Sequence, residues 1–219
     1  MRLGDFDWLT SMKVQMFAVG KVPTNCYVVS CEETGEAVIV DPAFERLSET
    51  EEVFAMVDET CLKLKSIMNT HGHPDHTCGN GFVKEKFSVP ILVHEKDAHF
   101  LGDAGLSIAQ AFGFVGSPPA DALLQDGDSV KFGKVTLKVV CTPGHSLGGI
   151  SLVGVRDVFT GDTLFKGSIG RTDFPDSSEV DMKNSLAKLA CLPNSFVVYP
   201  GHGSTTTIGE EKRSNPFLQ

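Results

Sequence analysis

The chain has few positively charged residues and no long apolar run, and these two absences argue against nucleic-acid and membrane partners. Its 219 residues include 19 Lys and Arg against 28 Asp and Glu, which gives a formal net charge of −9 and an isoelectric point near 5.2. Nucleic-acid partners require clustered positive charge, so we expect no nucleic-acid partner. No apolar run reaches about 18 residues, so we expect no membrane-spanning segment and no membrane partner.

The sequence also lacks a secretory signal and a CxxC motif. Met1 to Thr10 contain Asp5 and Asp7 and no apolar stretch flanked by positive charge. The cysteines are scattered, at Cys26, Cys31, Cys61, Cys78, Cys141 and Cys191. We therefore expect a cytoplasmic protein whose thiols stay reduced and act mainly as small core side chains.

Strands and helices alternate along the chain without a linker, which predicts one α/β domain over residues 1–219. Strands are predicted at 14–19, 25–31, 37–40, 66–69, 91–94, 130–132, 135–141, 150–153, 158–160 and 196–199. A capping box at 48–51 predicts a helix that runs to about Leu62, and further helices are predicted at 78–87 and 178–191. Both halves have strands followed by a helix. This order predicts two sheets with helices outside and a site where loops of both halves meet.

The segment from Glu95 to Gln125 has no clear assignment. It begins with a helical pattern, becomes rich in Gly and Phe, and ends at Pro118-Pro119. Such a segment is typical of a surface excursion or of a lid over a site. For residues 112–119 a plain surface loop is the simpler interpretation, and a wall of the pocket is the alternative.

The hexapeptide His71-Gly72-His73-Pro74-Asp75-His76 is the strongest chemical signal in the sequence. Three imidazoles and a carboxylate so close together are typical of metal ligands. A helix could not present all four groups to one point, because that requires i, i+4 spacing. An extended start places His71 and His73 on one side, and a turn at Pro74 swings Asp75 and His76 round. Two pairs of ligands leaving one loop in different directions suit two adjacent metals better than one.

Three more candidate ligands follow predicted strands in Gly-containing segments. They are His145 in TPGHS, Asp162 in TGDT and His202 in PGHG. Glycine lets the backbone approach a metal closely. Imidazole nitrogen and carboxylate oxygen suit Zn²⁺, and also Fe²⁺ or Mn²⁺, whereas the lack of a Cys ligand pair argues against a structural zinc site. His94 and His99 have no such setting and are interpreted as ordinary surface or core residues.

In chain order, HxHxDH (71–76), TPGH (142–145), GDTLF (161–165) and PGHG (200–203) resemble the motifs of the metallo-β-lactamase superfamily over nearly the whole chain. Within that superfamily, the small glyoxalase II-like hydrolases are the most similar subgroup. The segments that carry this second resemblance are Asn25-Cys26-Tyr27, Val40-Asp41, Gly161 to Phe165, Gly170 to Asp173 and the tail from Gly201 to Phe217.

The resemblance implies an αββα four-layer sandwich with two divalent cations, Zn²⁺ by preference, at one edge of the sheets. The implied ligands are His71, His73 and His145 for one cation, Asp75, His76 and His202 for the other, and Asp162 as a bridge between them. Such a pair lowers the pKa of a shared water, whose hydroxide attacks an ester-like carbonyl. Asp75 would orient this nucleophile, and Asp41 is interpreted as a buried carboxylate that braces the loops.

A small-molecule thioester fits this chemistry, because a thiolate with a pKa near 8.5 leaves with little protonation. In glyoxalase II-like enzymes a basic residue in this region meets the glutathione part of the substrate, and Arg171 stands in that place. An equally good interpretation has Arg171 tying its loop to Asp173 or Asp176. Only residues 203–219 follow His202, so the C-terminal helical region of larger glyoxalase II enzymes is not expected, which permits another small ester or thioester.

Four other functions are weighed against this one. A mononuclear iron persulfide dioxygenase resembles the chain around GRTDF (170–174) but would leave the second set of ligands unused. A β-lactamase is disfavoured because those enzymes are exported, and an RNA-processing nuclease by the acidic charge. A non-catalytic metal-binding module is disfavoured as well. A purely structural site fills every coordination position of its metal with protein ligands and would need fewer ligands than this chain offers. The sequence does not predict an oligomeric state.

Overall fold

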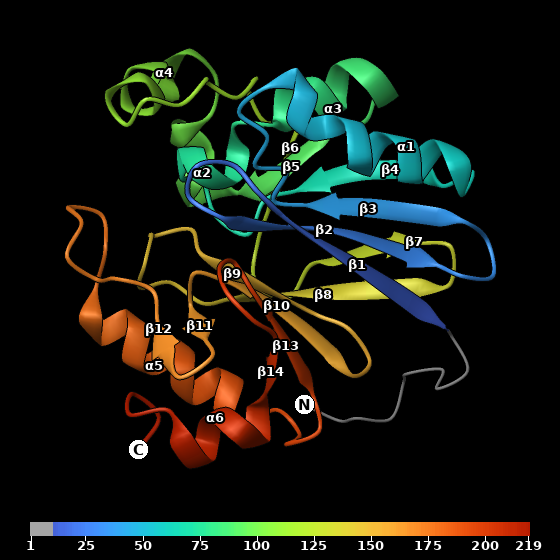
Figure 1. Ribbon diagram of the computed structural model, residues 1–219. Coiled ribbons are helices and arrows are strands. Elements are labelled where there is room, and N and C mark those ends of the chain that lie inside the picture. The colour runs from blue at the N-terminus through green and yellow to red at the C-terminus, as the bar shows by residue number, and fades with distance from the viewer. Residues whose placement is uncertain (1–10) are drawn as a thin grey trace.

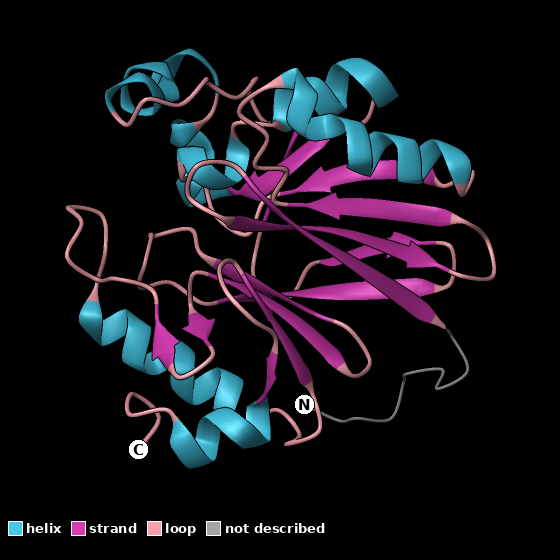
Figure 2. Cartoon of the chain, viewed as in Figure 1, coloured by secondary structure: helices cyan, strands magenta, loops and turns pink. Residues whose placement is uncertain are grey.

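A computed structural model describes residues 11–219 and shows two sheets packed face to face, with helices on both outer sides (Figures 1 and 2). The expectation about Met1 to Thr10 concerns residues outside this described part. Among the helices of residues 11–219, none combines the length and the apolar composition needed to cross a bilayer.

The first sheet has six strands, antiparallel from β1 to β3 and parallel from β3 to β6. In spatial order they are β1 (Met12–Val19), β2 (Thr24–Cys31), β3 (Glu36–Val40), β4 (Lys63–Met68), β5 (Ile91–His94) and β6 (Ala122–Leu124). The helices of this half are α1 (Glu51–Glu59), α2 (Pro74–Thr77), α3 (Asn80–Phe87) and α4 (Gly102–Ala111), with the 3-10 turns η1 (Leu47–Thr50) and η2 (Glu95–Phe100).

The second sheet also has six strands, and its outer face is covered by α5 (Glu179–Ala190) and α6 (Ile208–Ser214) (Figure 1). In spatial order the strands are β14 (Thr206–Thr207), β13 (Val197–Pro200), β10 (Asp157–Gly161), β9 (Ile150–Val153), β8 (Val135–Cys141) and β7 (Ser129–Phe132). A separate two-stranded ribbon pairs β11 (Leu164–Phe165) with β12 (Ser168–Ile169).

The side chains of β2 show why the layers stack in this order, because the whole strand is buried. Successive side chains of a strand point to opposite faces. Val28 joins the apolar cluster under α1 and α3, whereas Tyr27 and Val29 join the cluster between the two sheets. A third cluster, which includes Val158 and Met182, joins the second sheet to α5. Three apolar clusters therefore lie between four layers. This arrangement is the αββα sandwich that the sequence predicts.

The sequence-predicted strands are confirmed, with ends that shift by a few residues. The predicted capping box at 48–51 is wrong, because residues 47–50 form η1 and no side chain caps α1. Thr50 has helical backbone angles, and its hydroxyl donates to the Leu47 carbonyl at 2.7 Å. An N-cap residue needs extended angles, so Thr50 serves the turn before the helix instead. The helix also ends at Glu59 rather than near Leu62.

The cysteine expectation is half right. Cys26, Cys31 and Cys78 are buried core side chains, whereas Cys61 and Cys191 are exposed. The segment that had no clear assignment, 95–125, contains η2, α4 and β6, so much of it is regular structure.

Candidate metal centre

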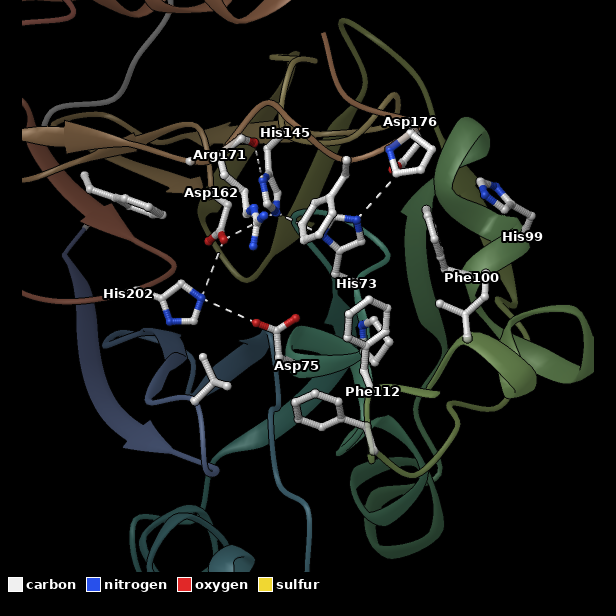
Figure 3. A pocket seen from close by; sticks show the side chains of 18 residues that line it. His73, Asp75, His99, Phe100, Phe112, His145, Asp162, Arg171, Asp176 and His202 are labelled. Atoms are coloured by element: carbon white, nitrogen blue, oxygen red, sulfur yellow. Dashed lines mark hydrogen bonds and ion pairs between the residues drawn. The ribbon is translucent and has the colours of Figure 1, made fainter. Parts of the chain in front are cut away.

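Four loops meet at one edge of the sandwich (Figure 1). They follow the carboxyl ends of β4, β8, β10 and β13. The loop after β4 carries the hexapeptide, and the other three carry His145, Asp162 and His202. The turn predicted at Pro74 is present, because Pro74 is the first residue of α2 and follows extended backbone at His73. Figure 3 shows His145, Asp162 and His202 turned toward His73 and Asp75 of the hexapeptide.

The seven predicted ligands fall into three overlapping groups, in each of which the donor atoms lie within 4.8 Å of one another. The groups are His71, His73 and His145; His71, His76 and Asp162; and Asp75, His76 and His202. The first and third are the two sets that the family resemblance implies. Asp162 Oδ2 lies 3.5 Å from Nε2 of both His145 and His202. Asp162 therefore lies between the two sets, where a bridging ligand has to be.

Three of the imidazoles are oriented by an oxygen on the side away from the site. The contacts are His76 Nδ1 to Asp41 Oδ2 at 3.0 Å, His145 Nδ1 to the Arg171 carbonyl at 2.9 Å, and His202 Nδ1 to the Pro23 carbonyl at 2.8 Å. A carbonyl or carboxylate oxygen only accepts hydrogen bonds, so each Nδ1 is the donor. Nε2 of each neutral ring therefore keeps a free lone pair that faces the site.

The atoms that face the site lack ordinary partners, which is the test of whether a metal fits here. Nε2 of His76 and Nε2 of His202 lie 3.3 Å apart. When both rings are neutral, as metal ligands must be, their Nδ1 atoms carry the proton and neither of these nitrogens can donate to the other. His71 Nε2 and Asp162 Oδ1 are buried and have no hydrogen-bond partner. Buried polar atoms are nearly always paired, and cations would satisfy all four atoms, so these residues fit a dinuclear metal site.

Asp41 braces this arrangement, as expected from the sequence. Its side chain is almost fully buried. Oδ1 accepts from the Thr70 amide at 2.8 Å, and Oδ2 accepts from the Thr70 hydroxyl at 2.6 Å and from His76 Nδ1 at 3.0 Å. The Thr70 hydroxyl oxygen also lies 3.2 Å from His71 Nδ1. Asp41 therefore orients His76 directly and His71 through Thr70.

The turn that carries His202 is held by residues from β2. The Asn25 side-chain amide donates to the carbonyls of Pro200 and Gly203 at 2.9 and 2.8 Å. The Tyr27 hydroxyl donates to the Pro200 carbonyl at 2.6 Å. Asn25 and Tyr27 are the residues of the early segment that the sequence comparison with glyoxalase II-like enzymes singles out, and these contacts give that segment a physical role.

Asp97 in η2 is a second buried brace, and sequence analysis does not single it out. Its carboxylate accepts from the Gly72 amide at 2.9 Å, the Ser146 hydroxyl at 2.7 Å and the Gly148 amide at 2.6 Å. These bonds join the loop of the hexapeptide to the loop that carries His145. No motif surrounds Asp97, and its partners are brought to it only by the tertiary fold, so the sequence holds no signal that could have found it.

We expect Asp97→Ala to lower the free energy of unfolding by about 3 kcal/mol, because three buried donors would lose their acceptor. Urea unfolding monitored by circular dichroism measures this change. Asp103→Ala is the control, since Asp103 is an exposed residue in the first turn of α4. A loss smaller than about 1 kcal/mol in Asp97→Ala would show that the loops do not depend on this carboxylate.

Carboxylates and imidazoles at the centre shift each other's pKa. Burial alone would lower the pKa of His76, but the neighbouring carboxylates, led by Asp162, raise it well above its usual value. Burial is likewise outweighed at His202, where hydrogen bonds to Asp162 and Asp75 raise the pKa to about 9. Burial would raise the pKa of Asp162, but the charge of His76 holds it well below its usual value. The carboxylates are therefore ionised, and a cation that binds here displaces protons from imidazoles.

The metal centre is the floor of a cavity of about 810 Å³ (Figure 3). Phe112 and Phe114 line it, so the surface-loop interpretation is wrong for this part of 112–119. His99 also lines the wall, as an exposed residue outside the three groups of donors, with Nδ1 2.9 Å from the Lys96 carbonyl oxygen. His94 is buried outside the cavity lining, with Nε2 3.2 Å from Cys141 Sγ.

The interpretation of Arg171 as a tie to Asp173 is confirmed, and its contact with a substrate stays a prediction. It lines the cavity, and its guanidinium donates from Nε and Nη2 to the two carboxylate oxygens of Asp173 at 2.6 and 2.8 Å. Its Cζ lies 4.3 Å from the centre of the Phe174 ring. Asp176 is not a partner of Arg171, and its Oδ2 lies 3.7 Å from His73 Nε2 instead.

Comparison with known proteins agrees with this geometry. The sequence model of the metallo-beta-lactamase superfamily matches residues 19–202. The hydroxyacylglutathione hydrolase GloC of Haemophilus influenzae is 36% identical over 216 residues, which cover 94% of this chain and 98% of that protein.

Two solved structures share the fold and a third of the sequence. The crystal structure of the BLEG-1 B3 metallo-beta-lactamase has a TM-score of 0.86 at 34% identity and covers 94% of this chain and 100% of that one. The crystal structure of TTHA1623 in a di-iron-bound form has a TM-score of 0.82 at 34% identity, with the same coverage of 94% and 100%. The chain therefore belongs to the metallo-β-lactamase superfamily of metal-dependent hydrolases.

Proposed function

We propose that this protein is a dinuclear metal-dependent thioesterase of the glyoxalase II type, which cleaves S-acylglutathione thioesters related to S-lactoylglutathione. The observation that carries the proposal is the meeting of two sets of donor atoms at Asp162, on the floor of an open cavity. The Haemophilus influenzae relative, whose name is hydroxyacylglutathione hydrolase, supports the choice of substrate.

In this proposal each cation has its own set of protein ligands. One cation would be held by His71, His73 and His145 and the other by Asp75, His76 and His202, and Asp162 would supply a carboxylate to both. Zn²⁺ suits this mixture of nitrogen and oxygen donors best, with Fe²⁺ or Mn²⁺ as alternatives. When bound, such cations supply Lewis acidity, which brings the pKa of water towards roughly 7 and polarises a carbonyl oxygen.

The remaining steps belong to protein side chains. Asp75 lines the cavity, and its Oδ2 lies 3.5 Å from His202 Nε2. Its other oxygen, Oδ1, would accept a hydrogen bond from the attacking water and so orient it toward the thioester carbonyl. The leaving thiolate has a pKa near 8.5 and needs no general acid.

The proposal also treats residues 1–219 as one hydrolase domain that acts in the cytoplasm, where its free thiols would stay reduced.

Arg171 is proposed to attract the anionic part of the substrate. Asp173 engages Nε and Nη2, which leaves donors on Nη1 for a substrate carboxylate. We expect Arg171→Ala to raise KM for S-lactoylglutathione about fivefold and to change kcat by less than about twofold, because an exposed, partly neutralised charge contributes modest binding. The Arg171 carbonyl that orients His145 is kept in this variant. Steady-state kinetics measures both constants.

Arg213→Ala is the matched control, because Arg213 is also exposed and paired with one carboxylate, that of Glu210 in α6. This variant should leave KM unchanged. An unchanged KM in Arg171→Ala as well would remove Arg171 from the substrate site.

The proposed function is tested by metal analysis and a substrate panel on protein reconstituted with Zn²⁺ or Fe²⁺. The panel contains S-lactoylglutathione, other acyl thioesters, a lactam and glutathione persulfide, with oxygen uptake recorded alongside. We expect two metal equivalents per chain and release of free thiol from the thioesters. One equivalent of iron with oxygen consumption on the persulfide would replace the hydrolase with a dioxygenase. Turnover of the lactam alone would make the protein a lactamase.

A further inference from the structure

The cavity above the metal centre is walled mainly by phenylalanine side chains from both halves of the molecule. These are Phe100 from η2, Phe112 and Phe114 from the segment after α4, and Phe165 and Phe174 from the second half. Val22, Ile108, Pro74 and Pro175 add to the apolar lining. Figure 3 shows Phe100 and Phe112 on the side of the cavity opposite His202 and Asp162. A substrate carbonyl placed over the metal centre would therefore have an apolar wall beside it.

The cavity offers little to a polar acyl group. Among the described lining residues, Arg171 is the only lysine or arginine, and Asp173 and Phe174 already engage its guanidinium. Lys21 lies beside the wall, but its Nζ donates to the carbonyls of Phe112 and Gly113 at 3.2 and 2.7 Å. A single partly engaged cation can meet one end of a substrate. Outside the metal centre, the only other charged or titratable side chains of the described lining are Asp176, next to His73, and His99.

The apolar wall of the cavity is preformed, and part of it is exposed to solvent. Lys21 Nζ lies 3.9 Å from the centre of the Phe114 ring, so the same ammonium that binds the 112 and 113 carbonyls fixes this segment. Even so, Phe112 remains 57% exposed and Val22 43% exposed at the cavity. Bare apolar surface in a concave site favours a ligand that covers it, at about 25 cal/mol for each Å² removed from water. A lactoyl group is too small and too polar to do so.

We infer that the acyl group of the physiological thioester is a bulky apolar one, aliphatic or aromatic, which packs against Phe100, Phe112 and Phe114. This inference rests on the proposed function for the identity of the reaction and adds the class of acyl group. Phe112 is then a specificity-determining residue, because its exposed ring becomes buried when the substrate binds. The thiol part lies toward Arg171, whose guanidinium stacks on Phe174.

The inference is tested by binding of the carboxylate products, which does not depend on turnover. Acetate, butanoate and hexanoate are titrated into the metal-loaded protein by calorimetry. We expect the dissociation constant to fall roughly threefold to fourfold for each added methylene, as for burial of a CH₂ group. In Phe112→Ala the hexanoate-to-acetate preference should fall at least about fivefold. Phe217→Ala is the control, because Phe217 is similarly exposed, at 53%, and lies outside the cavity lining.

A series of thioesters that differ only in the acyl group tests the apolar acyl site separately from the thioesterase activity. With glutathione as the constant thiol, hexanoyl and phenylacetyl thioesters should exceed the lactoyl thioester in kcat/KM by about tenfold or more. Hydrolysis of all thioesters with no gain from acyl size, or carboxylate affinities that do not change with length, would overturn the apolar acyl site and leave the thioesterase intact. Carboxylate affinities that rise with length in a protein that hydrolyses no thioester would support the apolar site and reject the thioesterase.

Discussion

Asp162→Ala is expected to release both metals together, from two equivalents per chain to well below one, and to lower kcat/KM by roughly 10³-fold or more. The reason is the position of its carboxylate, with Oδ2 3.5 Å from Nε2 of both His145 and His202 and Oδ1 3.3 Å from His76 Nε2. Asp162 also shares one group of donors with His71 and His76, which belong to different sets. Elemental analysis after dialysis against a weak chelator measures the loss, and circular dichroism confirms that the fold is kept.

Asp75→Ala is the informative comparison for this variant. Asp75 belongs to only one of the three groups of donors, the one with His76 and His202. Its removal should weaken one metal and leave about one equivalent per chain, because His71, His73 and His145 are untouched. Retention of a full equivalent by Asp162→Ala, equal to that of Asp75→Ala, would show that Asp162 serves a single metal and does not bridge.

The convergence of the candidate ligands could be predicted because their signal is local. Each candidate ligand follows a strand and lies in a short segment with glycine or proline, and parallel strands deliver their carboxyl ends to one edge of a sheet. The strands themselves could be predicted for the same kind of reason. In β8 the buried and less buried residues alternate, and in β2 a continuous apolar run marks a strand covered on both faces.

The braces and the cavity could not be predicted, because their partners are distant in sequence. Asp97 contacts residues 25 to 51 positions away, and only the packing of η2 against two loops brings them together. Phe112 and Phe174 belong to different halves of the chain, yet their ring centres lie 6.5 Å apart in the wall. The capping box failed for a local reason, because Ser48 lies inside η1 and α1 begins only at Glu51, so Ser48 does not stand at the N-cap.

The second large effect is expected at Gly201. Its lack of a side chain leaves room for Asp162 and His76 to pack against its backbone. A methyl group added there would overlap Asp162 Oδ1 and come within 2.7 Å of His76 Cε1. Gly201 is not among the residues with positive φ, so its backbone admits alanine and the substitution tests space alone. Its amide also donates to the Gly161 carbonyl at 2.8 Å, which holds it close to the loop of Asp162.

Gly201→Ala should therefore displace Asp162 or His76 by a large fraction of an ångström, reduce the metal content to below about one equivalent and lower kcat/KM by roughly 10²-fold. Gly81→Ala in α3 is the matched control, because a methyl group there would meet only Pro118 Cδ at an ordinary 3.6 Å and alanine favours a helix. It should keep both metals and melt no lower than the unmodified protein. If Gly201→Ala also kept two equivalents and full activity, the two ligands could move without loss, and the close packing of the 200–203 turn against Asp162 would have no part in building the centre.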